Sequence, residues 1–240
     1  MIKNKPFIAI LKKELWGHFN SLNAYVFIAV FLVVITYLYF QGLFLIGQTN
    51  MRNFFVLLPW FFLFLIPALS MKIWAEEKSQ GTIETLLTLP LADSHIVLAK
   101  FVGSFIFIGI TLLFSIGIPL SLSKIGDLDW GPVIGSYLGA WLLGGAYLAM
   151  GQFISSLTKN QIVSFLISIA IAFGLLVIGL PFVLQKSGIL SSILFTLSTT
   201  THFDNMTKGV IDLRDVVYYL SFIGLFLYLN VYTIVRRHWK

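Results

Sequence analysis

Six long apolar stretches constrain the fold of this chain more than any other feature. Each is close to the roughly 20 residues that an α-helix needs to cross the hydrocarbon core of a bilayer. They cover residues 24–45, 54–71, 96–122, 133–157, 162–184 and 216–235. Only 11% of the residues are charged, which is too few for an ordinary soluble domain. The pattern predicts an all-α integral membrane protein, with six transmembrane helices in a single domain spanning residues 1–240.

The basic residues are distributed unequally between the two sides of these stretches. If the N-terminus is cytoplasmic, the outer side holds few of the 16 Lys and Arg residues: Arg52, Lys124, Lys186, Lys208 and Arg214. Positive charge concentrates on the cytoplasmic side of membrane proteins. We therefore expect a multi-pass protein of the bacterial cytoplasmic (inner) membrane, with both termini in the cytoplasm. The net charge of +6 then reflects topology, and nucleic acid is not an expected partner.

The stretch at residues 6–22 has the pattern of an amphipathic helix. Its apolar residues recur at four-residue steps: Phe7, Leu11, Leu15 and Phe19. Such a helix is expected to lie along the inner leaflet, in contact with membrane lipid. A secretory signal is the alternative. The first apolar run is about 20 residues long and has no small-residue cleavage pattern, which favours a retained anchor.

A charged stretch, Trp74–Lys100, interrupts the apolar first half of the chain. Gly81 permits a break after the second span, and Pro90 forces another. Between them the apolar residues have helical spacing: Ile83, Leu86, Leu87 and Pro90. A short helix over 82–90 is therefore predicted. Because short helices are marginal in water, it must pack against another protein or lie on the lipid surface.

The residues of this stretch resemble a motif of type-two ATP-binding cassette (ABC) exporters. In the membrane subunit of that family, Glu-x-x-x-Gly-Thr-x-Glu-x-Leu-Leu-x-x-Pro recurs in a cytoplasmic loop that forms a coupling helix. The matching residues here, which are followed by Lys100, are Glu77, Gly81, Thr82, Glu84, Leu86, Leu87 and Pro90. The resemblance implies that these residues couple the chain to an ATPase, with Gly81 at the bend, Glu84 as a polar contact, and Leu86 and Leu87 in an apolar cleft.

The resemblance also implies the rest of the assembly. It extends to Lys13-Glu14-Leu15, Phe19 and Ser21-x-x-Ala24-Tyr25, which look like the elbow helix of these permeases, although Leu22 stands where proline is common. The expected partners are a cytoplasmic ABC ATPase subunit and a second permease, either another copy or a homologue. ATP and Mg would bind to the ATPase, and this chain would carry no cofactor.

The segment at residues 188–215 is the longest one expected outside the cytoplasm. Asp204 is predicted to cap a short helix that stops at Gly209, and Asp212 to cap the sixth span, with Asp215 in its first turn. His202 and Asp204 make a poor metal pair without a third ligand, so capping and packing are the favoured roles. The order of His202, Gly209, Asp212 and Asp215 is similar to the permeases of gliding motility and nitrous-oxide-reductase maturation, which would allow a periplasmic component.

Two spans carry residues that affect packing. Pro59 and Pro67 favour kinks in the second span, either as a lever into the cytoplasmic loop or as packing features. The fourth span carries Gly135, Gly139 and Gly144, at spacings that let helices approach closely, within the subunit or across a dimer. Asp93 or Ser94 is expected to cap the third span.

The sequence lacks the motifs of an enzyme. It has no Gly-x-x-x-x-Gly-Lys-Ser/Thr phosphate loop, no His-Glu-x-x-His, no Gly-x-Ser-x-Gly, no cluster of carboxylates that resembles a metal site, and no cysteine. Charged residues are also missing from the depth of the membrane, which argues against ion-coupled transport. We expect a non-catalytic exporter permease. The alternative is a membrane scaffold or assembly subunit that transmits ATPase motion to a periplasmic partner without moving a substrate.

Overall fold

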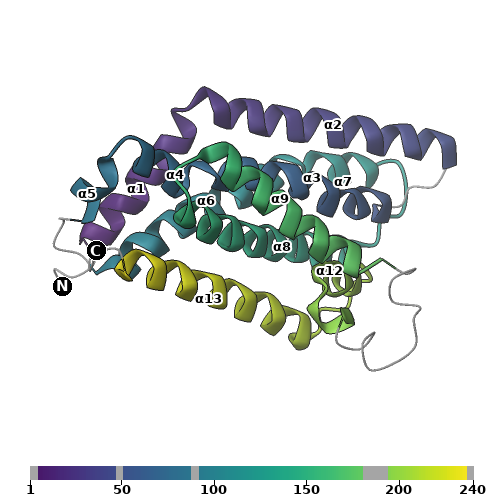
Figure 1. Ribbon diagram of the computed structural model, residues 1–240. Helices are drawn as coiled ribbons and strands as arrows, with labels where there is room; N and C mark the ends of the chain where they lie inside the picture. The colour runs from purple at the N-terminus through teal and green to yellow at the C-terminus, as the bar shows by residue number, and fades with distance from the viewer. Residues whose placement is uncertain (1–4, 47–50, 88–91, 181–193, 237–240) are drawn as a thin grey trace.

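The computed structural model describes residues 5–46, 51–87, 92–180 and 194–236. Within these ranges the regular structure is helical, and six helices are long and apolar enough to cross a membrane. The predicted all-α membrane fold is therefore confirmed. The helices, labelled as in Figure 1, are α1 (Lys5–Phe19), α2 (Leu22–Ile46), α3 (Arg52–Ser70), α4 (Lys72–Ser79), α5 (Thr82–Leu87), α6 (Asp93–Phe114), α7 (Gly117–Leu122), α8 (Trp130–Leu157), α9 (Gln161–Ile178), α12 (Thr199–Thr207) and α13 (Leu213–Val235).

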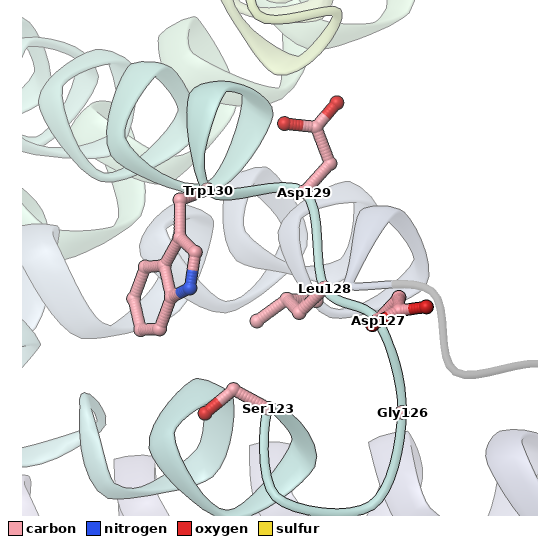
Figure 2. A pocket seen from close by; sticks show the side chains of 6 residues that line it. All are labelled: Ser123, Gly126, Asp127, Leu128, Asp129 and Trp130. Atoms are coloured by element: carbon pink, nitrogen blue, oxygen red, sulfur yellow. The ribbon is translucent and has the colours of Figure 1, made fainter.

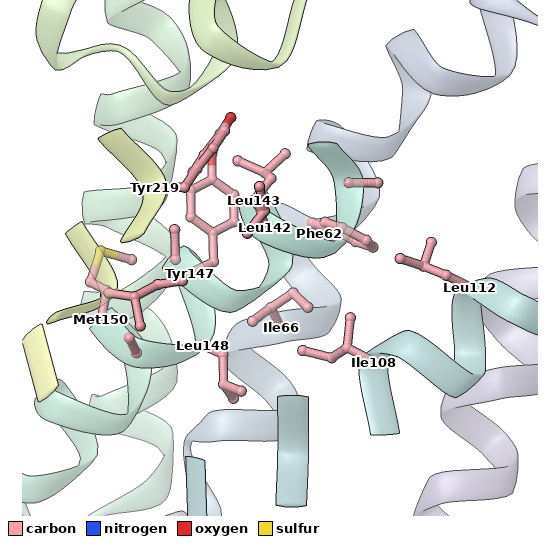
Figure 3. Close-up of a cluster of buried hydrophobic side chains, with 14 of the residues drawn as sticks. Phe62, Ile66, Ile108, Leu112, Leu142, Leu143, Tyr147, Leu148, Met150 and Tyr219 are labelled. Carbon is pink, nitrogen blue, oxygen red and sulfur yellow. The ribbon is translucent and has the colours of Figure 1, made fainter. Parts of the chain in front are cut away.

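Helix α8 lies at the centre of the bundle. It packs against α3, α6, α9, α12 and α13, and 78% of its most apolar window is buried. The corresponding share is only 17% in α2, 22% in α9 and 28% in α13. Figure 3 shows apolar side chains of α3, α6 and α13 meeting those of α8 around Tyr147. The least buried spans are thus the ones that leave most of their surface for lipid or for another protein.

The glycines of the fourth span make the close contacts of α8 inside the subunit. A Cβ atom added at Gly135 would lie 2.8 Å from the carbonyl oxygen of Met206 in α12, and one at Gly139 would lie 3.1 Å from the Met206 Cβ. At Gly144 it would meet Ile108 of α6 at 3.1 Å. The sequence left open whether these glycines face the same subunit or a partner. In the structure they pack against α12 and α6 of the same chain.

The N-terminal stretch forms a separate helix, as predicted. Helix α1 ends at Phe19 and α2 begins at Leu22, with the Ala24 amide donating to the Ser21 carbonyl across the turn. Helix α1 packs against α6 and α2, and Ile10 is buried in the contact. The sharp change of direction forms without a proline at Leu22.

The second and third spans depart from single continuous helices. The second span is α3 followed by α4, with one residue, Met71, between them, and α3 continues through both Pro59 and Pro67. The third span, predicted over 96–122, consists of two helices, α6 and α7. Pro119 explains the break, because it has no amide hydrogen to donate and its ring clashes with the carbonyl four residues earlier, at Ser115.

Two predicted boundaries are wrong. Neither Asp93 nor Ser94 is the N-cap of the third span, since Ala92 occupies that position without a side-chain bond and α6 already begins at Asp93. Helix α9 of the fifth span ends at Ile178, with Gly179 as its C-cap, whereas a helix continuing to residue 184 was expected. The region from 181 to 193, which includes the first part of the predicted segment 188–215, lies outside the described residues.

Replacing Gly135 by Ala is expected to destabilise the protein. The added methyl group would press on the Met206 carbonyl, and overpacking of this kind costs about 1–3 kcal/mol. The matched control is Gly174→Ala in the exposed face of α9, where nothing lies within 4 Å of the added atom. Thermal unfolding in one lipid or detergent should show a lower midpoint for the first variant alone. Equal midpoints for both would contradict close packing of α12 on α8.

Candidate ATPase-docking surface

The charged stretch that follows α3 folds as two short helices joined at a glycine. Helix α4 ends at Ser79 with Gln80 as its C-cap, and Gly81 has a φ of +71°, a conformation that favours glycine. Helix α5 then runs from Thr82 to Leu87. In Figure 1, α5 stands at the end of the bundle, at the same end as α1 and the last turn of α13. The predicted bend at Gly81 is confirmed, and α5 follows it with Ile83 buried against the rest of the protein.

Some residues of the predicted coupling motif lie on the protein surface, and Glu77 is largely buried. Thr82 and Glu84 are exposed on α5, and the Thr82 hydroxyl donates to the Glu77 carbonyl at 3.3 Å. Leu86 and Leu87 belong to α5 by their backbone, although their side chains lie outside the described part of the chain. Pro90 lies outside it entirely. The described helix therefore covers 82–87 of the predicted 82–90.

Glu77 instead points into the protein, towards a buried lysine. The Lys100 ammonium lies 2.8 Å from Glu77 Oε1 and 2.9 Å from Glu14 Oε1, so it joins α6 to α4 and α1. Lys100 is only 2% exposed, and its ammonium also lies 5.2 Å from the centre of the Trp74 ring. The motif carboxylate thus supports the loop from within, whereas Glu84 is available to a partner. We call Glu14, Glu77 and Lys100 the ion cluster.

A single serine holds the junction between the second span and α4. The Ser155 hydroxyl of α8 accepts from the backbone amides of Trp74 at 3.1 Å and Ala75 at 3.0 Å, and donates to the Met71 carbonyl at 2.8 Å. The side chain therefore satisfies backbone groups that the interruption at Met71 sets free. One turn further along α4, the Lys78 ammonium donates to the Ser156 carbonyl near the C-terminal end of α8, where a positive charge is favoured.

His18 ties the far end of α1 to α6. Its Nε2 lies 3.0 Å from the Ser104 hydroxyl, and its ring stacks on Phe107 with centres 5.1 Å apart. Burial lowers the pKa of His18 from its ordinary value of 6.5, and the nearby Lys100 charge lowers it as well, while Glu14 opposes both. The imidazole is therefore neutral at pH 7.

Helix α12 lies at the opposite end of the bundle from α5 (Figure 1). Asp204 does not cap this helix as predicted; it lies exposed inside it, and Ser198 is the N-cap, accepting from the Thr201 amide at 3.4 Å. The helix ends at Thr207 and Gly209 follows with a φ of +84°, close to the predicted stop. Asp212 does cap α13, accepting from the Arg214 amide at 2.9 Å.

At this end of the bundle, His202 pairs with Asp215 of α13 and not with Asp204, the carboxylate two residues along the chain. His202 Nδ1 lies 2.6 Å from Asp215 Oδ1, and its ring stacks on Tyr218 with centres 4.0 Å apart. His202 Nε2 lies 3.2 Å from the Thr196 carbonyl. These contacts join α12 to the start of α13. Among the described residues no group of three His, Asp or Glu side chains is arranged to hold a metal.

An open hollow lies in the loop between α7 and α8, at this same end of the bundle (Figure 2). It is lined by Ser123, Gly126, Asp127, Leu128, Asp129 and Trp130. One of its two carboxylates has a structural use, since Asp129 accepts from the Gly131 amide at 3.0 Å and caps α8. The hollow adds no catalytic constellation to the site at α5.

These features define a class of protein. Six membrane-spanning helices, one of them the central helix α8, with the short helix α5 at one end of the bundle, are the architecture of a polytopic membrane subunit. The sequence profile described as "ABC-2 family transporter protein" matches residues 26–236, and the chain belongs to that family. None of the curated proteins compared with the chain matches it. It is the multi-pass membrane subunit of an ABC transporter, and its family works with a cytoplasmic ABC ATPase and typically a second permease. The closer relation to gliding-motility and nitrous-oxide-reductase permeases stays a prediction.

Removing the Ser155 hydroxyl is expected to loosen α4. The Ser155→Ala variant loses three buried hydrogen bonds and leaves the amides of Trp74 and Ala75 without their acceptor, at a cost of about 1–3 kcal/mol. Ser221→Ala is the control, since Ser221 is exposed and bonds only within its own helix. Hydrogen exchange should rise at residues 72–79 in the first variant and not in the second. Unchanged exchange in both would show that Ser155 does not hold the junction.

Acid is expected to weaken the attachment of α1 through His18. Because the folded protein has the lower His18 pKa, the unfolded chain binds the proton more readily, so stability is full above about pH 6.5 and falls as the pH drops below it. Thermal midpoints between about pH 7.5 and about pH 5.5 should fall more steeply for the natural protein than for His18→Gln. Parallel pH profiles would contradict the assignment.

Proposed function

We propose that this chain is the permease subunit of an exporter in the bacterial cytoplasmic membrane, and that α5 is where a separate ABC ATPase docks. ATP and Mg bind to that ATPase, and this chain contributes motion and a pathway but no cofactor. The observation that carries the proposal is the projection of α5 beyond the spans on a base fixed by Ser155 and the ion cluster.

The docking surface consists of the exposed residues Thr82 and Glu84 together with Leu86, Leu87 and Pro90 of the motif. Glu84 offers a charged contact, and the two leucines fill an apolar cleft of the ATPase. Gly81 fixes the angle between α4 and α5. Glu77 acts behind this surface, through its contact with Lys100.

The route of the motion follows the packing of α4. Closure of two ATPases on ATP displaces α5 and α4, and α4 continues into α3 across the single residue Met71. Because α3 packs against α2, α8 and α9, a shift of α3 changes contacts through the bundle. The least buried spans, α2, α9 and α13, provide faces for lipid and for a second permease, either another copy or a homologue.

A second candidate is a membrane scaffold or assembly subunit that uses the same docking surface without translocating a substrate. The observation in its favour is the structured extracytoplasmic end, where α12 is fixed to α13 by His202 and Asp215 and can present a periplasmic partner with a defined surface. ATP-dependent export of a cargo by reconstituted complexes would exclude this alternative.

The docking proposal is tested by co-purification with the ATPase. Replacing both Leu86 and Leu87 by Asp should abolish recovery of the ATPase while the permease still inserts into the membrane, because two charges cannot enter an apolar cleft without a large desolvation cost. The control is Leu197→Asp with Leu213→Asp, the same change at exposed positions on the opposite end. Full recovery of the complex with the first pair of substitutions would contradict docking at α5.

The role of Glu84 is tested by activity. The Glu84→Ala variant should lower ATP-dependent activity of the assembled complex more than it lowers assembly, because a single exposed charge contributes little to affinity but positions the contact. Gln80→Ala, at the exposed end of α4, is the control. Activity equal to that of the natural complex would remove Glu84 from the coupling contact.

A further inference from the structure

The inference concerns the ion cluster and rests on the proposed function of α5. We propose that Lys100 is a positioning residue that fastens α1 to α4, so that the two helices move as one body when the ATPase displaces α5. The elbow helix then takes part in the motion at the inner leaflet instead of serving only as an anchor.

The first step is the packing of the two helices. The backbone of α4 packs mainly against α3, α5, α8 and α9, whereas α1 packs against α6 and α2. Between α1 and α4 themselves, a connection is made by the long side chain of Lys100, which leaves α6 and reaches Glu77 on α4 and Glu14 on α1. One side chain therefore bridges helices whose backbones pack mainly elsewhere.

The second step is the strength of the bridge. The Lys100 side chain is 3% exposed, and both carboxylate side chains are 18% exposed. Ion pairs shielded from water in this way are strongly attractive, and removing one partner leaves an uncompensated buried charge. Two carboxylates that share one ammonium would also repel each other without it. Separation of α1 from α4 is thus disfavoured far more than for a surface ion pair.

The third step is the close seating of α1 on α6. A Cβ atom added at Gly103 would lie 2.9 Å from Glu14 Cβ, and His18 meets Ser104 and stacks on Phe107 one turn further on. Helix α1 therefore follows the same face of α6 that carries Lys100. This packing fixes the backbone of α1 at Glu14 and so places the Glu14 carboxylate near the Lys100 ammonium.

The fourth step is the position of the cluster relative to the docking helix. Glu77 lies one helical turn before the bend at Gly81. A displacement of α5 reaches Glu77 within that turn, and through Lys100 it reaches α1. Without the bridge, α4 stays attached to α8 through Ser155 and Lys78 while α1 stays on α6, so the two helices can move independently.

Distances between spin labels test the inference, and the absence of cysteine from the chain simplifies the labelling. Cysteines are introduced at the exposed positions Lys12 on α1, Ser79 on α4 and Ile162 at the start of α9. Pulsed electron paramagnetic resonance is recorded on the full chain in lipid nanodiscs, with and without its ATPase and a non-hydrolysable ATP analogue. It measures the α1–α4 distance between labels at positions 12 and 79, and the α4–α9 distance between labels at positions 79 and 162.

The variant that separates coupling from folding is the triple substitution Glu14→Gln, Glu77→Gln and Lys100→Met. Replacing a whole buried ion cluster by neutral groups of similar shape keeps packing, whereas Lys100→Met alone leaves two unpaired carboxylates and can fail to fold. Lys13→Met, the loss of an exposed lysine on α1, is the control.

In the natural protein the α1–α4 distance should stay narrow and unchanged by nucleotide, while the α4–α9 distance shifts. In the triple variant the α1–α4 distribution should become at least about twice as broad, already in the permease alone, because loss of a buried ion cluster removes the specific link between the helices. The Lys13→Met control should behave like the natural protein.

The inference is overturned if the triple variant keeps the narrow α1–α4 distribution, or if that distance changes with nucleotide in the natural protein as much as the α4–α9 distance does. Failure of the ATPase to bind, or an α4–α9 distance insensitive to nucleotide, contradicts the proposed function instead. The broadening in the permease alone still decides the role of Lys100 in that case.

Discussion

Buried backbone groups have no water to bind inside a membrane protein, and this constraint decides where the helices of this permease can break. At Met71 the second span is interrupted, and the Ser155 hydroxyl takes over the backbone groups set free. At Ser115 the third span is interrupted ahead of Pro119, and the Ser115 hydroxyl donates to the Leu112 carbonyl. Each break is thus accompanied by a serine, and the first break is followed by α4 and α5 at one end of the bundle.

The two ends of the bundle use charge in different ways. At the α5 end, the ion cluster is buried between three helices, and α5 itself carries one exposed charge, Glu84. At the other end, His202 and Asp215 join α12 to α13, and Asp212 caps the last span. Between the ends, the glycines of α8 have no side chain, so neighbouring helices pack closely against it. This arrangement suits a subunit whose energy arrives from outside the bilayer at one end only.

Local sequence rules predicted the features that depend on a few neighbouring residues. The bend at Gly81 and the Asp212 cap are confirmed because each is decided within one turn of chain. The caps predicted at Asp93 or Ser94 and at Asp204 are wrong: the N-cap of α6 is Ala92, which makes no side-chain bond, and the N-cap of α12 is Ser198. The docking role of Thr82, Glu84, Leu86, Leu87 and Pro90 came from the family motif and stays a proposal.

By itself, the sequence determined that the chain is a six-span helical membrane protein with a charged stretch between its second and third spans, because apolar length and helical spacing are properties of continuous segments. Only the tertiary structure decided that Glu77 faces Lys100, that Glu14 joins them from 86 residues away, and that Ser155 receives the amides of Trp74 and Ala75. No local periodicity specifies such pairs, because they depend on how α1, α4, α6 and α8 are placed around one another. That placement follows from packing of the whole bundle about its glycine-rich central helix.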